Sequence, residues 1–166
     1  AVDPDARVMK LTNPELADHP FIFMVHVEGM VLDDDEAAAL RNHLQLGGSL
    51  LVTDFWGQDA WNNFRRQMRL VFPDREWTEL GMDHPLFRAI FTLEGPMHRL
   101  RVPTMQFWNP ASDGNNPNSY LQYRHRGEGS EVMRVQALHD DHGRIMAVAV
   151  HNSDISDGWE RESENE

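Results

Sequence analysis

The sequence predicts an α/β fold in which a parallel sheet is covered by helices on both faces. Three segments have the unbroken apolar character of strands that are buried on two sides, namely 21–25, 49–53 and 144–150. A half-exposed antiparallel strand would instead alternate apolar and polar residues. A helical pattern separates the first two segments, and such strand–helix–strand units are almost always right-handed.

Two helices are expected to connect and follow the first two strands. The first begins at Asp33, which can cap it together with Glu36, and it stops at the pair Gly47-Gly48. The second is expected from Gln58 to about Phe72, because apolar residues recur on one face of this segment and a proline follows it. Both helices would pack an apolar stripe against the sheet.

Between these helices and the last buried strand the pattern is weaker. Short strands are expected at 105–108 and 131–138, and the segment 109–118 between them consists of turn-forming residues. In the second of these strands Arg134 and Gln136 alternate with apolar residues, as they would on a half-exposed strand.

The composition excludes several classes of protein. The formal net charge of −12 argues against general binding of nucleic acid, because that affinity comes from clustered Lys and Arg. The absence of cysteine excludes thiol nucleophiles, disulfides and thiolate metal sites. No apolar run approaches the roughly 20 residues that a membrane-spanning helix requires. We therefore expect residues 1–166 to form a single α/β domain without a membrane span.

Polar residues follow each of the three buried strands. His26 comes after the first strand, Asp54 and Trp56 after the second, and the third runs into a polar segment that begins at His151. Because the carboxyl ends of parallel strands open on one edge of a sheet, where ligands bind, we expect these side chains to converge. The expected ligand-binding residues are His26, Asp54, Trp56, His151, Asn152, Asp154, Asp157 and Trp159.

Three interpretations of this edge are open. His26, Asp54, His151 and Asp154 are nitrogen and oxygen ligands of the kind that suits Zn, Mn or Fe, although their spacing matches no compact metal motif. Alternatively, Asp54 or Asp154 orients His151 for acid–base catalysis, which makes these three the candidate catalytic residues. The third interpretation is a polar loop whose side chains bond to the backbone. We expect no metal and no cofactor at this site.

Short motifs recur in order from about Leu11 to Glu164 and together resemble one bacterial family. The motifs are 11–16, 20–24, 32–41 with Gly47-Gly48, 54–57, 72–75, 83–87, 143–146, 151–154 and 157–160. The family they resemble is catalogued as domain of unknown function 4159, and it is similar in fold to class I glutamine amidotransferases, a flavodoxin-like arrangement. The resemblance implies a further strand and helix before Leu11 and a continuation, with a further helix, past Glu166, so that this chain would be an incomplete copy of the domain.

The resemblance also implies which activity to exclude. In the amidotransferases a G-x-C-x-G turn follows the strand that corresponds to 49–53. Laid on that turn, Thr53 to Gly57 places Phe55 at the position of the nucleophilic cysteine. A phenyl ring has no lone pair with which to attack an amide, so glutamine hydrolysis by that mechanism is excluded. His151 would occupy roughly the position of the triad histidine without its role.

We therefore expect a non-catalytic amidotransferase-like domain that binds a small ligand or a protein partner at this edge. The alternative is a hydrolase, with or without a metal, that uses a His/Asp site at the carboxyl edge of the sheet. The chain starts Ala-Val-Asp rather than with Met, which is compatible with an upstream signal or anchor. We expect a periplasmic or envelope-associated location rather than a cytoplasmic one.

Overall fold

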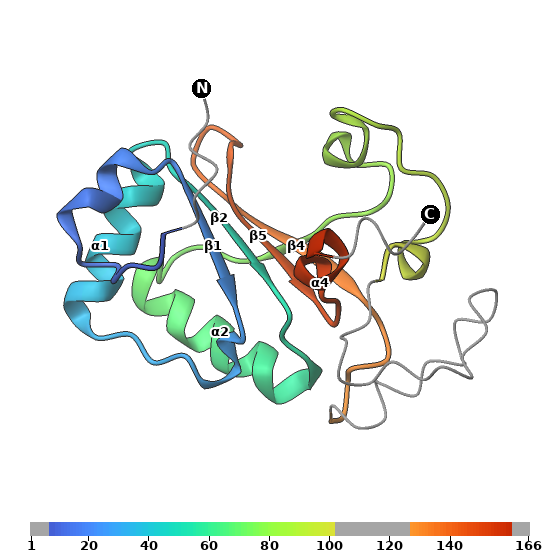
Figure 1. Cartoon of the computed structure of the whole chain (residues 1–166), viewed down its shortest axis with the longest axis horizontal. Coiled ribbons are helices and arrows are strands. Elements are labelled where there is room, and N and C mark those ends of the chain that lie inside the picture. Colours follow the sequence, from blue (N-terminus) through green and yellow to red (C-terminus); the bar gives the residue numbers. More distant parts are fainter. Residues whose placement is uncertain (1–6, 102–126, 161–166) are drawn as a thin grey trace.

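A five-stranded mixed sheet forms the centre of the molecule in the computed structural model, which describes residues 7–101 and 127–160 (Figure 1). The strands lie in the order β1-β2-β5-β4-β3. The expected strand at 105–108 and the expected loop at 109–118 lie outside the described residues. The strands are β1 (Phe21–Val25), β2 (Ser49–Thr53), β3 (Thr78–Glu79), β4 (Arg134–His139) and β5 (Ile145–His151).

The three predicted buried strands are confirmed as a parallel group, but the prediction of an all-parallel sheet is wrong. β1 pairs with β2 and β2 pairs with β5 in parallel, whereas β4 runs antiparallel to both β5 and β3. The reason is the short connection between β4 and β5, a turn in which Gly143 N donates to Asp140 O. A parallel connection needs a crossover of a dozen or more residues, so a turn of this length enforces a hairpin.

Both long helices form close to where the sequence predicts them. α1 (Asp34–Gln45) begins with a complete capping box, because the Asp33 side chain accepts from Glu36 N at 2.8 Å and the Glu36 side chain accepts from Asp33 N at 3.2 Å. α2 (Gly57–Val71) begins one residue before the predicted Gln58. The shorter elements are the 3-10 turns η1 (Pro14–Asp18), η2 (Val27–Gly29), η3 (Pro85–Arg88) and η4 (Met97–Leu100) and the short helix α4 (Ile155–Glu160).

The two long helices cover the same face of the sheet, whereas helices were expected on both faces. Ile22, Leu50 and Ala149 of the parallel strands pack with Leu40 of α1 and Phe64 of α2 in the main core. Among the described residues, the opposite face is covered only by short elements, namely η3, η4, α4 and the loops beside them (Figure 1). Tertiary arrangement decides this, since an apolar strand fits either arrangement equally well.

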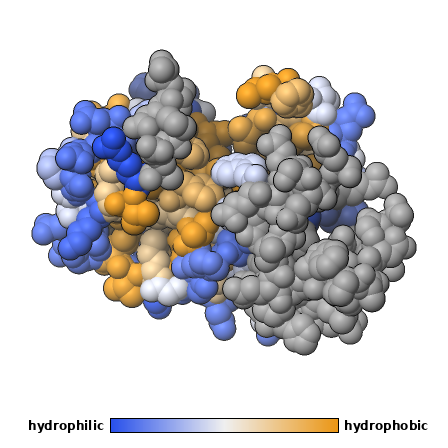
Figure 2. All heavy atoms as spheres, viewed as in Figure 1, coloured by the Kyte–Doolittle hydropathy of each residue, from blue (hydrophilic) through white to orange (hydrophobic). Residues whose placement is uncertain are grey.

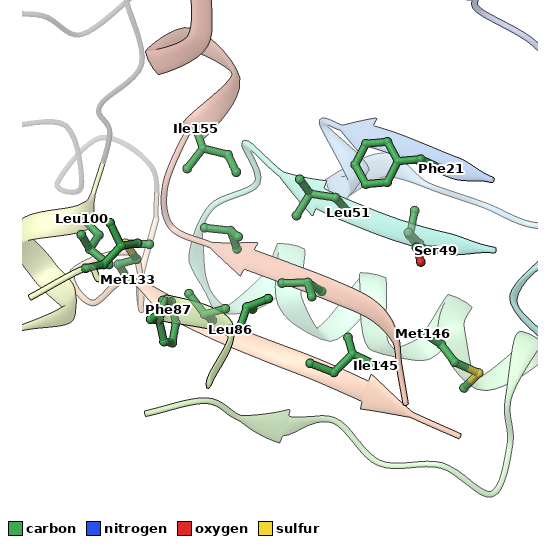
Figure 3. Close-up of a pocket in the computed structure, with 15 residues that line it drawn as sticks. Phe21, Ser49, Leu51, Leu86, Phe87, Leu100, Met133, Ile145, Met146 and Ile155 are labelled. Atoms are coloured by element: carbon green, nitrogen blue, oxygen red, sulfur yellow. The ribbon is translucent and has the colours of Figure 1, made fainter. Parts of the chain in front are cut away.

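The less covered face carries an open apolar cavity of about 580 Å³. Side chains from β1, β2, β5 and η3 face this space, among them Phe21, Leu51 and Phe87 (Figure 3). Phe21 is 54% exposed, which is unusual for a large apolar residue in a strand. Hydrophobic residues accordingly reach the surface in the middle of the view in Figure 2, where Figure 1 places β1.

Gln136 departs from its predicted orientation. The alternation in its strand predicts a solvent-facing amide, yet Gln136 is only 9% exposed, because it points to the same face as the helices.

In the part of the chain that the structure describes, no helix is long and apolar enough to cross a membrane.

The capping box gives a test of this local structure. Replacing Asp33 with Ala removes the acceptor for Glu36 N and should lower the free energy of unfolding by about 1 kcal/mol in chemical denaturation. Asp34→Ala is the matched control, because Asp34 lies in the same first turn without making the cap and should cost only a few tenths of a kcal/mol, about the size of a helix-dipole effect. Equal losses in the two variants would contradict the capping role.

Candidate functional site

The carboxyl ends of the three parallel strands converge, as predicted, and each is followed by a residue in a left-handed conformation. His26 (φ 54°) follows β1 directly, Asp54 (φ 50°) follows β2, and Asn152 (φ 61°) follows β5. Backbone hydrogen bonds tie these three ends together, because His26 N donates to Asp54 O at 3.2 Å and Asp54 N donates to Ser153 O at 3.0 Å. Non-glycine residues rarely adopt this conformation, so the clustering marks the edge as a specialised region.

The side chains of the first two of these residues are in contact. His26 Nε2 lies 3.0 Å from Asp54 Oδ2, and Trp56 Nε1 donates to Asp54 Oδ1 at 2.8 Å. The Asp54 side chain is only 7% exposed, whereas that of His26 is 57% exposed. Glu28 lies farther away, with its Oε1 3.7 Å from His26 Nδ1. A buried carboxylate therefore holds an imidazole that faces solvent.

Asn152 is a structural connector rather than an exposed ligand. Its side chain is fully buried, its Oδ1 accepts from Gly57 N at 2.9 Å, and its Nδ2 donates to Gly129 O and Val132 O at 2.9 and 2.7 Å. These bonds use the hydrogen-bonding capacity of the amide within the protein. The third interpretation of the sequence, a polar loop with side chains bonded to the backbone, describes Asn152 correctly.

The turn that follows β2 is closed by the protein itself. Phe55 is fully buried and its ring lies 6.2 Å from that of Trp61 and 5.4 Å from that of Phe64, measured between centroids. The first amides of α2 are also occupied, because Gly57 N donates to Asn152 and Gln58 N donates to Glu128 O at 2.7 Å. Phe55 supplies no nucleophilic atom, and the amides of Gly57 and Gln58 already have acceptors within the protein.

His151 lies in the same aromatic cluster. It is 3% exposed, and its ring centroid is 4.9 Å from that of Phe55 and 5.5 Å from that of Trp61. Burial lowers the pKa of His151 to about 4, so the imidazole is neutral at pH 7. Its Nε2 lies 2.9 Å from Gly57 O, and a hydrogen bond there requires the proton to be on Nε2. Its buried Nδ1 has no hydrogen-bond partner in the structure.

The predicted pairing of His151 with an aspartate is not present. No hydrogen bond joins His151 to Asp54 or to Asp154, since Asp54 pairs with His26 and Asp154 accepts from the hydroxyl of Ser156. The prediction failed because His151 points toward α2, on the helix-covered face, while Asp54 turns toward the end of β1. Strand order alone does not determine these directions.

The aromatic residues expected at the edge lie apart. Trp56 is 6% exposed, and the guanidinium of Arg101 lies 5.0 Å above its ring. Trp159 is 59% exposed and packs against Phe23 on the less covered face, with 5.5 Å between ring centroids. The placement of the Asp157 side chain lies outside what the structure describes. Within residues 7–101 and 127–160, no group of three or more His, Asp or Glu side chains is arranged to hold a metal ion.

Sequence reasoning missed one residue that helps to build this edge. Arg101 donates to the carbonyls of Asn152, Glu131 and Ser130 at 3.0, 3.3 and 3.0 Å, and so holds the chain before β4 against the end of β5. No local pattern marks an arginine for this role, because its three acceptors are backbone atoms distant in sequence.

The fold and the site define a mixed α/β domain in which three parallel strands end at one edge. The turn after β2, the central strand of the three, is filled by the buried ring of Phe55. The chain belongs to the family described as Domain of unknown function (DUF4159), whose model matches residues 1–166. No curated protein matches the sequence.

The lowered pKa of His151 predicts a specific dependence of stability on pH. The folded state resists protonation of His151 below its ordinary pKa of 6.5, whereas the unfolded state does not. The free energy of unfolding therefore keeps its full value above pH 6.5. It falls by about 3 kcal/mol in all as the pH falls toward 4. Chemical denaturation at pH 6.5 and at pH 4 should show this loss for the wild type. The variant His151→Gln has no imidazole to protonate and should not show it. Parallel pH profiles would contradict it.

The buried hydrogen bonds and the left-handed φ of Asn152 predict a second effect on stability. Asn152→Ala leaves buried partners without a hydrogen bond and also places Ala at a left-handed φ, so it should lower the free energy of unfolding by about 3 kcal/mol. Asn152→Gly loses the same bonds but tolerates the φ, and it should cost about 1 kcal/mol less than Ala. If glycine and alanine cost the same, backbone strain at Asn152 is not important.

Proposed function

We propose that this chain is a non-catalytic domain of the glutamine amidotransferase-like, flavodoxin-like kind, and that it binds a ligand or partner at the carboxyl edge of its parallel strands. The observation that carries the proposal is the closed turn after β2, where Phe55 is fully buried. Amidotransferase chemistry at such a turn needs a nucleophile, donors for the oxyanion and an accessible base.

Each of these three requirements is unmet at the turn. Phe55 offers no nucleophilic atom, and the helix amides that could stabilise an oxyanion already donate to Asn152 and Glu128. His151 is buried, and its Nε2 is committed to Gly57 O. The same edge still presents polar groups that can bind without reacting, among them the exposed imidazole of His26. Binding is thus the activity that the geometry supports best.

Substitution at Phe55 tests the proposal. Phe55→Cys places a thiol at the nucleophile position, yet we expect no hydrolysis of L-glutamine above the buffer rate, because the oxyanion donors remain occupied. The variant should also lose roughly 2–4 kcal/mol of stability from the cavity it creates. Phe55→Leu is the control for altered packing. Measurable release of ammonia by the folded Cys variant would overturn the proposal.

A hydrolase that uses His26 and Asp54 is the second candidate, favoured by the 3.0 Å contact between a buried carboxylate and an exposed imidazole. A carboxylate that orients a histidine is a common arrangement for a general base. This candidate predicts turnover of 4-nitrophenyl acetate or bis(4-nitrophenyl) phosphate, with or without added Zn or Mn. The turnover should fall at least about 100-fold in Asp54→Asn. Absence of turnover under all these conditions would exclude the candidate.

A further inference from the structure

A polar cavity of about 370 Å³ lies on the helix-covered face, where the first turns of α2 face the outer strands of the sheet. Glu79 of β3, Gln136 of β4 and His151 of β5 line it from the sheet, and Gln58 lines it from α2. Register brings these side chains side by side, because Glu79 pairs with Gln136 in one ladder and Arg134 pairs with His151 in the next.

One buried side-chain atom in the cavity wall lacks a hydrogen-bond partner, namely Nδ1 of His151. Gln136, which is 9% exposed, also lines the cavity and adds a side-chain amide that can bond to a ligand. Buried polar groups in folded proteins are nearly always hydrogen-bonded to protein or to ordered water. The unpartnered Nδ1 of His151 therefore calls for a partner inside the cavity, and Gln136 is placed to bond to the same partner. The cavity is also much larger than the roughly 30 Å³ that one water molecule occupies in the liquid.

The hydrogen-bonding state of His151 defines what that partner must offer. Because Nε2 carries the proton that is donated to Gly57 O, Nδ1 presents a lone pair and can only accept. The group that fills the cavity must therefore donate an N–H or O–H bond to Nδ1. Gln136 can accept a second bond through its carbonyl oxygen and donate through its amide nitrogen.

The charges around the cavity favour a cation. Arg134 Nη1 lies 2.7 Å from Glu79 Oε2, so this guanidinium is already paired, and the carboxylate of Glu131 adds a further negative charge to the lining. The N-terminal amides of α2 already have acceptors within the protein, since those of Gly57 and Gln58 donate to Asn152 and Glu128. Two carboxylates and one guanidinium line the cavity, so an anion would meet a net negative charge and two helix amides that are already bonded.

We propose that this cavity binds a small organic cation with N–H donors, an amine or a guanidinium compound, whose N–H groups bond to His151 Nδ1 and Gln136 while Glu131 balances its charge. This proposal rests on the proposed binding function and names the ligand class for it. It places the ligand beside the closed turn, on the helix-covered face.

Titration with agmatine, which carries both an ammonium and a guanidinium group, tests the proposal. Long-range ¹H–¹⁵N spectra of the histidine rings should show the Nδ1 signal of His151 move in the direction expected of an acceptor, in step with backbone amide shifts at Gln58 and Gln136. Glucose provides hydroxyl donors without charge, and citrate is the anionic comparison. Binding of agmatine at least about tenfold tighter than either is expected, which corresponds to a difference of about 1.4 kcal/mol.

Two variants separate a ligand site from a structural role. Gln136→Leu keeps the volume and removes the side-chain amide, so it should weaken agmatine binding at least about tenfold while leaving the midpoint of thermal unfolding unchanged or higher. Glu131→Gln should weaken binding several-fold without a change in the fold. Glu15→Gln, an exposed acid in η1 outside the cavity lining, is the matched control and should bind as the wild type does.

The outcomes are distinct. No response of His151 to agmatine would mean that water alone fills the cavity, and glucose or citrate binding as tightly as agmatine would reject a cationic ligand; either result overturns the proposal. A lower unfolding midpoint of Gln136→Leu would do the same, because the amide would then be structural. None of these results would restore a nucleophile at Phe55, so the non-catalytic proposal stands or falls separately on the Phe55→Cys assay.

Discussion

The side chain of Asn152 is the interaction on which the rest of the carboxyl edge depends. It joins the end of β5 to the first amide of α2 and to two carbonyls of the chain that leads into β4. The backbone of Asn152 adds two more links, because its N–H donates to Phe55 O and its carbonyl accepts from Arg101. A single buried amide thus holds together segments that are far apart in the sequence.

This arrangement has a chemical consequence. The amide that organises the edge also occupies the start of α2, and Phe55 fills the space beside it. The amide of Gly57 is therefore committed to a bond within the protein. The exposed imidazole of His26 and the Nδ1 atom of His151 lie on different parts of this edge, because His26 follows β1 and His151 points toward α2.

The two faces of the sheet differ in what covers them and in the kind of cavity that they carry. The face under α1 and α2 is filled by a large core, and a polar recess lies there at the start of α2. The opposite face is apolar, is only partly covered by residues 7–101 and 127–160, and is hollowed by a larger cavity (Figure 3). In an α/β domain both faces of parallel strands usually lie against other layers, which is why their sequences are apolar throughout.

The sequence by itself determined the three parallel strands, the capping box of α1, the span of α2 and the convergence of the carboxyl ends of the three strands, because these follow from local patterns and from the direction of parallel strands. The tertiary structure alone decided that β4 runs antiparallel, that both long helices share one face and that Gln136 is buried. It also decided the partners of each polar residue, so that Asp54 holds His26 and His151 contacts Gly57. Such pairings depend on the direction of a side chain at the end of a strand, and the left-handed residues His26, Asp54 and Asn152 change that direction in a way that no periodic pattern records.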